Sequence, residues 1–313
     1  MRTAATPTAD LAHARLDLET YGVAIVRDVL TPQETADVRR RLYDAIPVSE
    51  EDEVATRGFA FDPDDRNVRV WHLLNLDPVF VELTRHPVAL DFVRHLLGPD
   101  FMLSNCSANI TEPGNKRMEM HADQGYVLPP WPARPLACVV GWLLDDMTEE
   151  NGGTRYVPGS HRHGRNPDPQ QSYETVGVEA PAGSIAVMDG RLWHQTGANS
   201  SRDTQRAAIL PYYVLRWLRP QVNWNAALWP ETVARLDEEF LHMLGYYTGN
   251  SEFHIPSGKR AQARPSAPVG RARQRRKIVQ AAAERALGRM MRSHFAGRRS
   301  SDKRGIATIA SAI

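Results

Sequence analysis

The first hundred residues carry short hydrophobic patterns that predict helices around one short strand. The segment 11–22, LAHARLDLETYG, has the spacing of a short helix that ends at Gly22. The apolar run VAIVRDVL at 23–30 predicts a strand. The segment 77–97, DPVFVELTRHPVALDFVRHLL, predicts two helices that are separated at Pro87.

A helix-capping signature opens the segment 31–46, TPQETADVRRRLYDAI. Thr31 is the expected N-cap, Pro32 fits the first turn, and Glu34 follows three residues after the cap. These residues predict a helix that begins at Pro32.

The pattern of hydrophobic residues changes at Phe101. From there to Val214 the apolar runs are short, rich in β-branched residues and separated by Gly, Pro and Asn turns. This pattern predicts an antiparallel sandwich or barrel, and the segment 231–244, ETVARLDEEFLHML, predicts one further helix. Helices followed by about eight strands indicate an α+β chain with flanking helices around a β core.

Charge divides the chain into two parts. The formal net charge is only +1, but residues 259–304 hold 15 Lys or Arg against two acids, and residues 1–258 carry a net charge of −12. We therefore expect an acidic domain over 1–258 and a basic tail over 259–313, with a linker at 259–276 and an amphipathic helix after it. The tail is either a solvated extension or a contact for an anionic surface or an acidic partner.

Composition excludes several classes of protein. Apolar residues make up 42% of the chain and charged residues 24%, which is typical of a globular domain. No apolar stretch is long enough for a transmembrane helix, and the N-terminus lacks a signal-peptide core. Two cysteines, Cys106 and Cys138, are expected to be buried thiols in a reducing, cytoplasmic setting. The oligomeric state stays open, with a homodimer among the options.

Candidate chemistry lies in the β region. His121 and Asp123 are two residues apart after a strand-like segment, so an extended chain would place both side chains on one face. His194 follows another short strand 73 residues later. Two imidazoles and one carboxylate form the facial triad that binds non-haem Fe(II) and leaves positions open for a chelating cosubstrate and O₂. Arg206 opens the next strand and offers a guanidinium for a dicarboxylate.

Several motifs together resemble the phytanoyl-CoA dioxygenase family of Fe(II)/2-oxoglutarate-dependent oxygenases. The resemblance covers about residues 15–255 and rests on HADQGY, ENGGTRYVPGSHR, WHQTGANSSRDTQRAAI and the helical lead-in that begins RVWHLLNLDP. It implies a double-stranded β-helix, a jelly-roll of the cupin kind. It also implies Fe(II), 2-oxoglutarate and O₂ as cofactor and cosubstrates.

The resemblance assigns roles to individual residues. It implies His121, Asp123 and His194 as the iron ligands and as the catalytic centre. It implies Arg206 as the partner of the distal carboxylate of 2-oxoglutarate, with Arg202 as the alternative because the preceding loop is one residue longer than usual.

The same resemblance implies further residues of the site. Trp142, Thr154 and Thr196 match positions around the cosubstrate, and Tyr126 and Trp131 lie in a segment that lines the substrate cavity in relatives. Relatives often carry Gln shortly before the first ligand, where this chain has Glu119. A carboxylate there would repel 2-oxoglutarate unless it points away or is protonated.

The expected activity is the oxidation, most simply the hydroxylation, of an unactivated C–H bond in a small substrate. Succinate and CO₂ would be the co-products. The aromatic residues and the PPWP stretch after HADQGY favour a hydrophobic natural product. The alternatives are an acyl-CoA or fatty-acid hydroxylase and a metal-binding jelly-roll without catalysis.

Overall fold

The computed structural model of the chain describes residues 3–51, 54–59, 62 and 64–246. The expected basic tail, its linker and its amphipathic helix lie outside these residues. Within them, no helix has the length and apolar character needed to cross a bilayer.

Eight helices and one 3-10 turn are found in the described ranges. They are α1 (Leu11–Tyr21), α2 (Pro32–Glu51), α3 (Leu73–Leu76), α4 (Pro78–Thr84), α5 (Pro87–Leu97), η1 (Ser160–Arg162), α6 (Trp224–Ala227), α7 (Pro230–Val233) and α8 (Glu238–Met243). Gly22 ends α1 with a positive φ of 85° while its N–H donates to the Leu18 carbonyl, as the sequence predicts. The break between α4 and α5 falls at Pro87, also as predicted.

The start of α2 confirms the capping signature. The Thr31 N–H donates to Glu34 Oε2 at 2.8 Å, and the Glu34 N–H donates to Thr31 Oγ1 at 3.3 Å. The prediction of one helix over 231–244 is wrong. The chain forms α7 and α8 instead, because the Asp237 side chain accepts the N–H of Phe240 and so caps a new helix.

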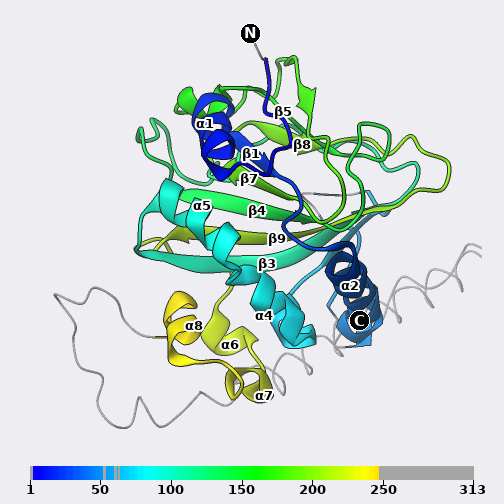
Figure 1. Ribbon diagram of the computed structural model, residues 1–313, viewed down its shortest axis with the longest axis vertical. Helices are drawn as coiled ribbons and strands as arrows, with labels where there is room; N and C mark the ends of the chain where they lie inside the picture. Colours follow the sequence, from blue (N-terminus) through cyan, green and yellow to red (C-terminus); the bar gives the residue numbers. More distant parts are fainter. Residues whose placement is uncertain (1–2, 52–53, 60–61, 63, 247–313) are drawn as a thin grey trace, which may run out of the picture. The chain divides into compact units, whose positions relative to one another are not determined.

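The strands form two antiparallel sheets (Figure 1). The larger sheet has the order β1 (Val23–Val26), β7 (Ile185–Asp189), β4 (Ala137–Leu143), β9 (Arg206–Leu215), β3 (Phe101–Thr111) and β2 (Asn67–Val70). The smaller sheet has the order β6 (Val176–Gly177), β5 (Thr154–Tyr156) and β8 (His194–Thr196). The strand predicted at 23–30 ends at Val26, and Asp28 follows with a positive φ of 61°.

The two faces of the larger sheet have different partners. Helices α4 and α5 lie across one face in Figure 1, and on this side Cys106, Cys138 and Trp142 join the main hydrophobic core. The opposite face joins a second core, in which Met188 of β7 packs with Tyr156 of the smaller sheet. Two antiparallel sheets with helices outside one of them are the α+β arrangement that the sequence predicts.

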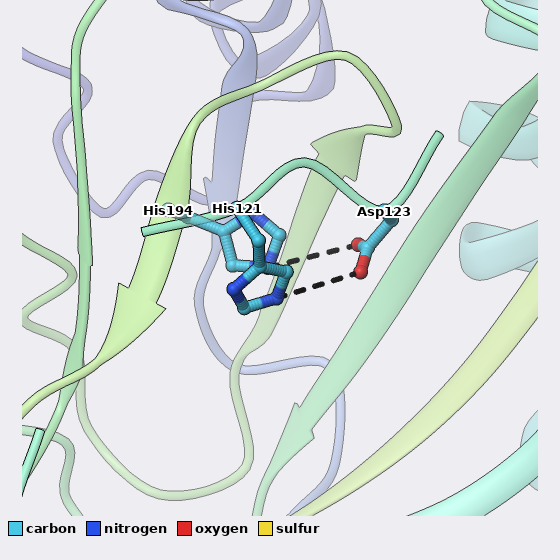
Figure 2. A group of neighbouring side chains, drawn as sticks. All are labelled: His121, Asp123 and His194. Carbon is cyan, nitrogen blue, oxygen red and sulfur yellow. Dashed lines mark ion pairs between the residues drawn. The ribbon is translucent and has the colours of Figure 1, made fainter. Parts of the chain in front are cut away.

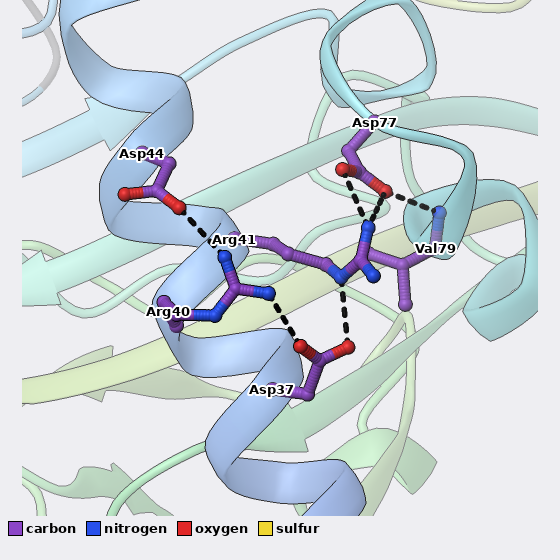
Figure 3. Close-up of polar contacts among 6 residues, drawn as sticks. All are labelled: Asp37, Arg40, Arg41, Asp44, Asp77 and Val79. Carbon is purple, nitrogen blue, oxygen red and sulfur yellow. Dashed lines mark hydrogen bonds and ion pairs between the residues drawn. The ribbon is translucent and has the colours of Figure 1, made fainter.

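Charged side chains connect α2 to α4 at the edge of the helical layer (Figure 3). Arg41 of α2 donates to Asp37 at 2.7 Å and to Asp77 Oδ2 at 2.9 Å. Asp77 is also the N-cap of α4, since its Oδ1 accepts the Val79 N–H at 2.8 Å. Arg40 extends this α2–α4 charge cluster by binding Asp37.

Candidate metal centre

The two candidate histidine ligands are joined through their backbones. His121 and His194 form an antiparallel bridge in which the His121 N–H donates to the His194 carbonyl at 3.0 Å and the reverse bond measures 2.8 Å. Immediately before His194, the Trp193 N–H donates to Ser160 Oγ at 2.9 Å. Residues 73 positions apart in the chain are therefore held side by side by main-chain hydrogen bonds.

Asp123 completes the group, because its carboxylate points at both imidazole rings (Figure 2). Its Oδ1 lies 4.0 Å from His121 Nε2, and its Oδ2 lies 3.7 Å from His194 Nε2. One ligand atom from each of the three residues falls within 4.8 Å of the others. The structure thus brings together the three residues that the sequence analysis proposes as ligands.

The hydrogen bonds of these side chains fit a divalent metal. His121 Nδ1 lies 2.9 Å from the Glu119 carbonyl and His194 Nδ1 lies 3.0 Å from the Leu192 carbonyl, so both Nδ1 atoms carry the proton and both Nε2 lone pairs are available. Asp123 Oδ2 is buried and has no hydrogen-bond partner among the described residues. Burial and the nearby His194 ring lower the pKa of His121 to about 4, which favours the neutral, ligating form.

A cavity of about 370 Å³ opens between the sheets at this group. Its lining comprises the three candidate ligands and polar, apolar and cationic side chains from both sheets: Arg69, Trp71, Asn105, Ser107, Asn109, Met118, His121, Asp123, Val139, Gly141, Leu143, Met147, Thr154, Ala186, Met188, His194, Thr196, Arg206, Ala208, Leu210, Tyr212 and Gln221. A cavity that combines an apolar wall with a few convergent polar groups is typical of a small-molecule site.

Arg206 is buried in this cavity at the start of β9. Its Nη1 donates to Asn109 Oδ1 at 3.1 Å and its Nη2 donates to the Gly152 carbonyl at 2.5 Å, while Nε has no partner among the described residues. Burial lowers the pKa of Arg206 to about 10, so the guanidinium stays protonated near neutrality. The cavity therefore holds a desolvated cation that an anionic ligand would neutralise.

Comparison with known proteins gives the family. A protein-family model, "Phytanoyl-CoA dioxygenase (PhyH)", matches residues 18–208. The chain belongs to the phytanoyl-CoA dioxygenase family of Fe(II)/2-oxoglutarate-dependent oxygenases. It is 38% identical to "Dioxygenase af480" of Aspergillus fumigatus over 240 residues, which cover 76% of this chain and 77% of that protein. It is 26% identical to "Uncharacterized protein Rv1501" of Mycobacterium tuberculosis over 275 residues, covering 78% and 91%.

Solved structures share the jelly-roll fold of the family. HygX from Streptomyces hygroscopicus, solved with nickel, 2-oxoglutarate and hygromycin B bound, is 16% identical with a TM-score of 0.53, covering 66% of this chain and 88% of HygX. SnoK, an α-ketoglutarate-dependent carbocyclase from nogalamycin biosynthesis, is 21% identical with a TM-score of 0.55, covering 72% and 90%. These similarities confirm the α+β jelly-roll prediction.

Two hydroxyl residues that the family resemblance added do line the cavity. Thr154 of β5 is paired directly with Thr196 of β8, and both belong to the cavity wall. The turn before Thr154 also supplies the Gly152 carbonyl that holds Arg206. Gly152 has a positive φ of 79°, and a Cβ there would lie 3.1 Å from the Gly197 carbonyl oxygen. A glycine is therefore required for the turn that orients Arg206.

The expectation for Trp142 disagrees with the structure. Side chains alternate along β4, so its neighbours Gly141 and Leu143 line the cavity while Trp142 points to the helical side. There its ring contacts that of His86 edge-on, with 5.2 Å between centroids. Trp142 belongs to the main core, and a family position does not fix the face of a strand.

The two aromatic residues after the ligands also lie outside the cavity lining. Trp131 packs with Ala122 and Trp193 in a small separate cluster. Tyr126 is 53% exposed, and its hydroxyl lies 3.4 Å from that of Tyr212, a residue of the cavity wall. Tyr126 is therefore at the margin of the cavity, and the prediction that Trp131 lines it disagrees with the structure.

The exposure of the side chains distinguishes Arg206 from its alternative Arg202 and also places Glu119. Arg202 is exposed and absent from the cavity wall, so Arg206 alone of the two faces the site. Glu119 is exposed as well, and Met118 lines the cavity in its vicinity. The side chain of Glu119 therefore lies outside the cavity wall.

Sequence reasoning missed the polar wall made by β2 and β3. Arg69 lines the cavity and is ion-paired at 2.9 Å with the buried Asp62, and burial lowers its pKa. Asn105, Ser107 and Asn109 line the cavity from every second position of β3. The signal was present in SNCSANI, where polar residues alternate with small apolar ones.

Proposed function

We propose that this protein is an Fe(II)/2-oxoglutarate-dependent dioxygenase that hydroxylates an unactivated C–H bond of a small, largely apolar natural product, with succinate and CO₂ as co-products. One observation carries the proposal: the His121, Asp123 and His194 group and the buried Arg206 open into the same cavity. A metal site and a desolvated cation in one cavity match the two ends of a chelating dicarboxylate.

Different residues of the cavity would bind the metal and the cosubstrate. His121 Nε2, Asp123 and His194 Nε2 would hold Fe(II), which with 2-oxoglutarate and O₂ supplies the oxidising chemistry. Arg206 would bind the distal carboxylate of 2-oxoglutarate, with Asn109 and the Gly152 carbonyl fixing its guanidinium. Thr154 and Thr196 would add hydroxyl contacts to the cosubstrate from the smaller sheet.

The remaining wall supports a largely apolar substrate. Val139, Leu143, Met188 and Leu210 face the cavity from three neighbouring strands of the larger sheet. Two of the similar structures, the carbocyclase SnoK and the epimerase SnoN, come from nogalamycin biosynthesis. Hydroxylation is therefore best tested by reaction under ¹⁸O₂ and mass spectrometry of the oxidised substrate. A hydroxylated product would contain ¹⁸O, whereas ring closure or epimerisation would incorporate no oxygen.

Two alternatives make different predictions. An acyl-CoA hydroxylase needs cations for the CoA phosphates, but of the arginines that line the cavity Arg69 is paired with Asp62, and Arg206 is assigned to 2-oxoglutarate. A binding protein without catalysis would hold metal and 2-oxoglutarate but release no succinate.

The decisive experiment measures succinate release by the full chain with Fe(II), 2-oxoglutarate and O₂. We expect succinate from the wild type and a loss of about 100-fold or more in Asp123→Ala, because second-sphere changes alone cost 10–100-fold. Glu119→Gln is the matched control, since Glu119 is exposed and close in sequence. Full succinate release by Asp123→Ala would contradict the proposal, as would retention of Ni(II) affinity in that variant.

The same proposal includes predictions about the basic tail, the cellular location of the enzyme and its oligomeric state. Cys106 and Cys138 are buried free thiols, which supports a cytoplasmic enzyme. Removal of residues 259–313 should leave succinate release intact while abolishing any binding to anionic vesicles or an acidic partner. Sedimentation equilibrium of the full chain would test the homodimer.

A further inference from the structure

The inner face of β3 carries three polar residues, and one of them, Asn105, has a buried oxygen without a partner among the described residues. Asn109 holds Arg206 through its Oδ1 and donates to Asn67 through its Nδ2. Asn105 is only 8% exposed, and its Oδ1 has no hydrogen-bond partner among the described residues. Its Nδ2 donates to Gln221 Oε1 at 3.3 Å. A buried amide oxygen without a partner is unfavourable unless a ligand supplies the donor.

A β-bulge interrupts β3 immediately before Asn105. The pairing of β3 with β9 shifts between Leu103 and Asn105, so Ser104 is the extra residue. Leu103 and Cys106 both face the helical core, although they are three positions apart, and Asn105 faces the cavity. Asn105 stays in step with Ser107 and Asn109 on the cavity face, and the bulge allows Leu103 to keep the helical face.

The same bulge fixes Gln221 beside Asn105. Ser104 Oγ accepts the Gln221 N–H at 2.9 Å, and the Ser104 carbonyl accepts the Val222 N–H at 3.0 Å. Gln221 is exposed at the edge of the cavity and brings a second amide to the same place. One local irregularity thus assembles a pair of neutral amides from two segments of the chain.

This amide pair lies at the end of the cavity opposite Arg206. Asn105 pairs with Tyr212 of β9, whereas the Arg206 guanidinium is held by Asn109, four positions further along β3 and therefore roughly 13 Å away along the strand. The Tyr212 hydroxyl donates to the Asp123 carbonyl at 3.1 Å, which connects the amide end to the metal-ligand loop. A ligand at Asn105 would lie near the metal site without occupying the Arg206 end.

We propose that Asn105, supported by Gln221, binds a hydroxyl group of an uncharged and otherwise apolar substrate; this inference rests on the proposed function and names its substrate class. A hydroxyl donates to Asn105 Oδ1 and can accept from an amide N–H of Gln221. The neighbouring cavity residues Val139 and Met188 are apolar and suit a hydrocarbon scaffold. The cationic residues of the wall lie elsewhere, because Arg69 pairs with Asn109.

Equilibrium binding tests the proposal without any turnover. The probes are 1-adamantanol and 1-methyladamantane, which exchange a hydroxyl for a methyl group on one rigid scaffold, and 1-adamantanecarboxylate as the charged analogue. Dissociation constants are measured by tryptophan fluorescence, since Trp71 lines the cavity. The titrations use the full chain, with and without Ni(II) and 2-oxoglutarate, so the outcome is separate from that of the succinate assay.

The wild type should bind the alcohol about three- to tenfold more tightly than the methyl analogue. Asn105→Leu should abolish this preference, and Gln221→Met should reduce it. Ser107→Ala is the matched control, because Ser107 lines the same cavity two residues further along β3, and it should keep the preference.

Three results would overturn the inference: no preference in the wild type, an undiminished preference in Asn105→Leu, or tighter binding of the carboxylate that depends on Asn105. Gln221 is exposed, so Gln221→Met keeps the test informative if Asn105→Leu does not fold.

Discussion

The α2–α4 charge cluster and the wall of the cavity both concentrate polar side chains, yet their hydrogen bonding is opposite. In the cluster, Arg41 binds two aspartates at once and Asp77 also caps a helix, so each member meets another member or the backbone. In the cavity wall, Asp123 Oδ2, Arg206 Nε and Asn105 Oδ1 are buried without partners among the described residues.

This difference distinguishes polar residues that stabilise the fold from polar residues that are available to bind a ligand. Partly exposed charges that satisfy one another stabilise a helix junction modestly, because water screens them. Buried polar atoms without partners lower the stability of the unliganded protein, and a bound metal or ligand can recover that loss. We therefore expect substitutions in the cavity wall to change ligand binding and substitutions in the cluster to change stability alone.

The largest expected effect comes from the buried cation. Arg206→Lys should raise the KM for 2-oxoglutarate about 100-fold, because an ammonium cannot keep the contacts to Asn109 and Gly152 while binding a carboxylate through two N–H groups. Arg202→Lys is the matched control on an exposed arginine and should leave the KM unchanged. Succinate release at varied 2-oxoglutarate measures both, and equal KM values would remove Arg206 from the cosubstrate site.

Metal binding should stabilise the fold through the ligand group. At a free Ni(II) concentration 100 times its Kd, the free energy of unfolding of the wild type should rise by about 2.7 kcal/mol. Asp123→Ala should lose most of this gain, while Asp28→Ala, at an exposed aspartate, should keep it. Denaturant titration with and without Ni(II) gives the answer, and an equal gain in Asp123→Ala would show that the metal binds elsewhere.

An intermediate effect is expected at the turn that holds Arg206. Gly152→Ala should lower the free energy of unfolding by about 1–2 kcal/mol because of its positive φ, and it should also raise the KM for 2-oxoglutarate by displacing the Gly152 carbonyl. Gly58→Ala has a similar φ of 74°, but the nearest atom to its Cβ is 3.6 Å away, so only stability should fall. A KM shift in both variants would contradict this distinction.

The smallest effect belongs to the α2–α4 charge cluster. Asp77→Ala should lower the free energy of unfolding by about 1 kcal/mol through loss of the α4 cap. Asp77→Ser should restore most of this loss, because serine caps a helix without binding Arg41 as an ion pair. Neither variant should change the KM for 2-oxoglutarate, and a changed KM would weaken the comparison between the two regions.

Local signals in the sequence predict much of the fold. The reciprocal bonds of Thr31 and Glu34 and the helix end at Gly22 depend on neighbouring residues only, so the sequence reveals them. The helix expected over 231–244 fails because Asp237 can serve either inside a helix or as a cap. Helical periodicity alone does not distinguish the two.

The sequence predicts the site residues that belong to motifs. It does not predict those whose face of the sheet depends on the register of the strands. His121 and His194 are found through their motifs, but the bridge that joins them is a long-range pairing. The side of β4 on which Trp142 lies depends on which alternate residues face the helices. The bulge at Ser104 reverses the alternation within β3, so counting back from Cys106 would place Leu103 on the wrong face.

The backbone bridge between His121 and His194 has a consequence for how the site is loaded. Each ring is also anchored to a carbonyl two residues before it, so neither histidine depends on a distant side chain for its orientation. The two imidazoles therefore keep their spacing when the ion leaves, and exchange of one metal for another requires no refolding. The ion that fills the site then depends on which metals are available as well as on the ligand set.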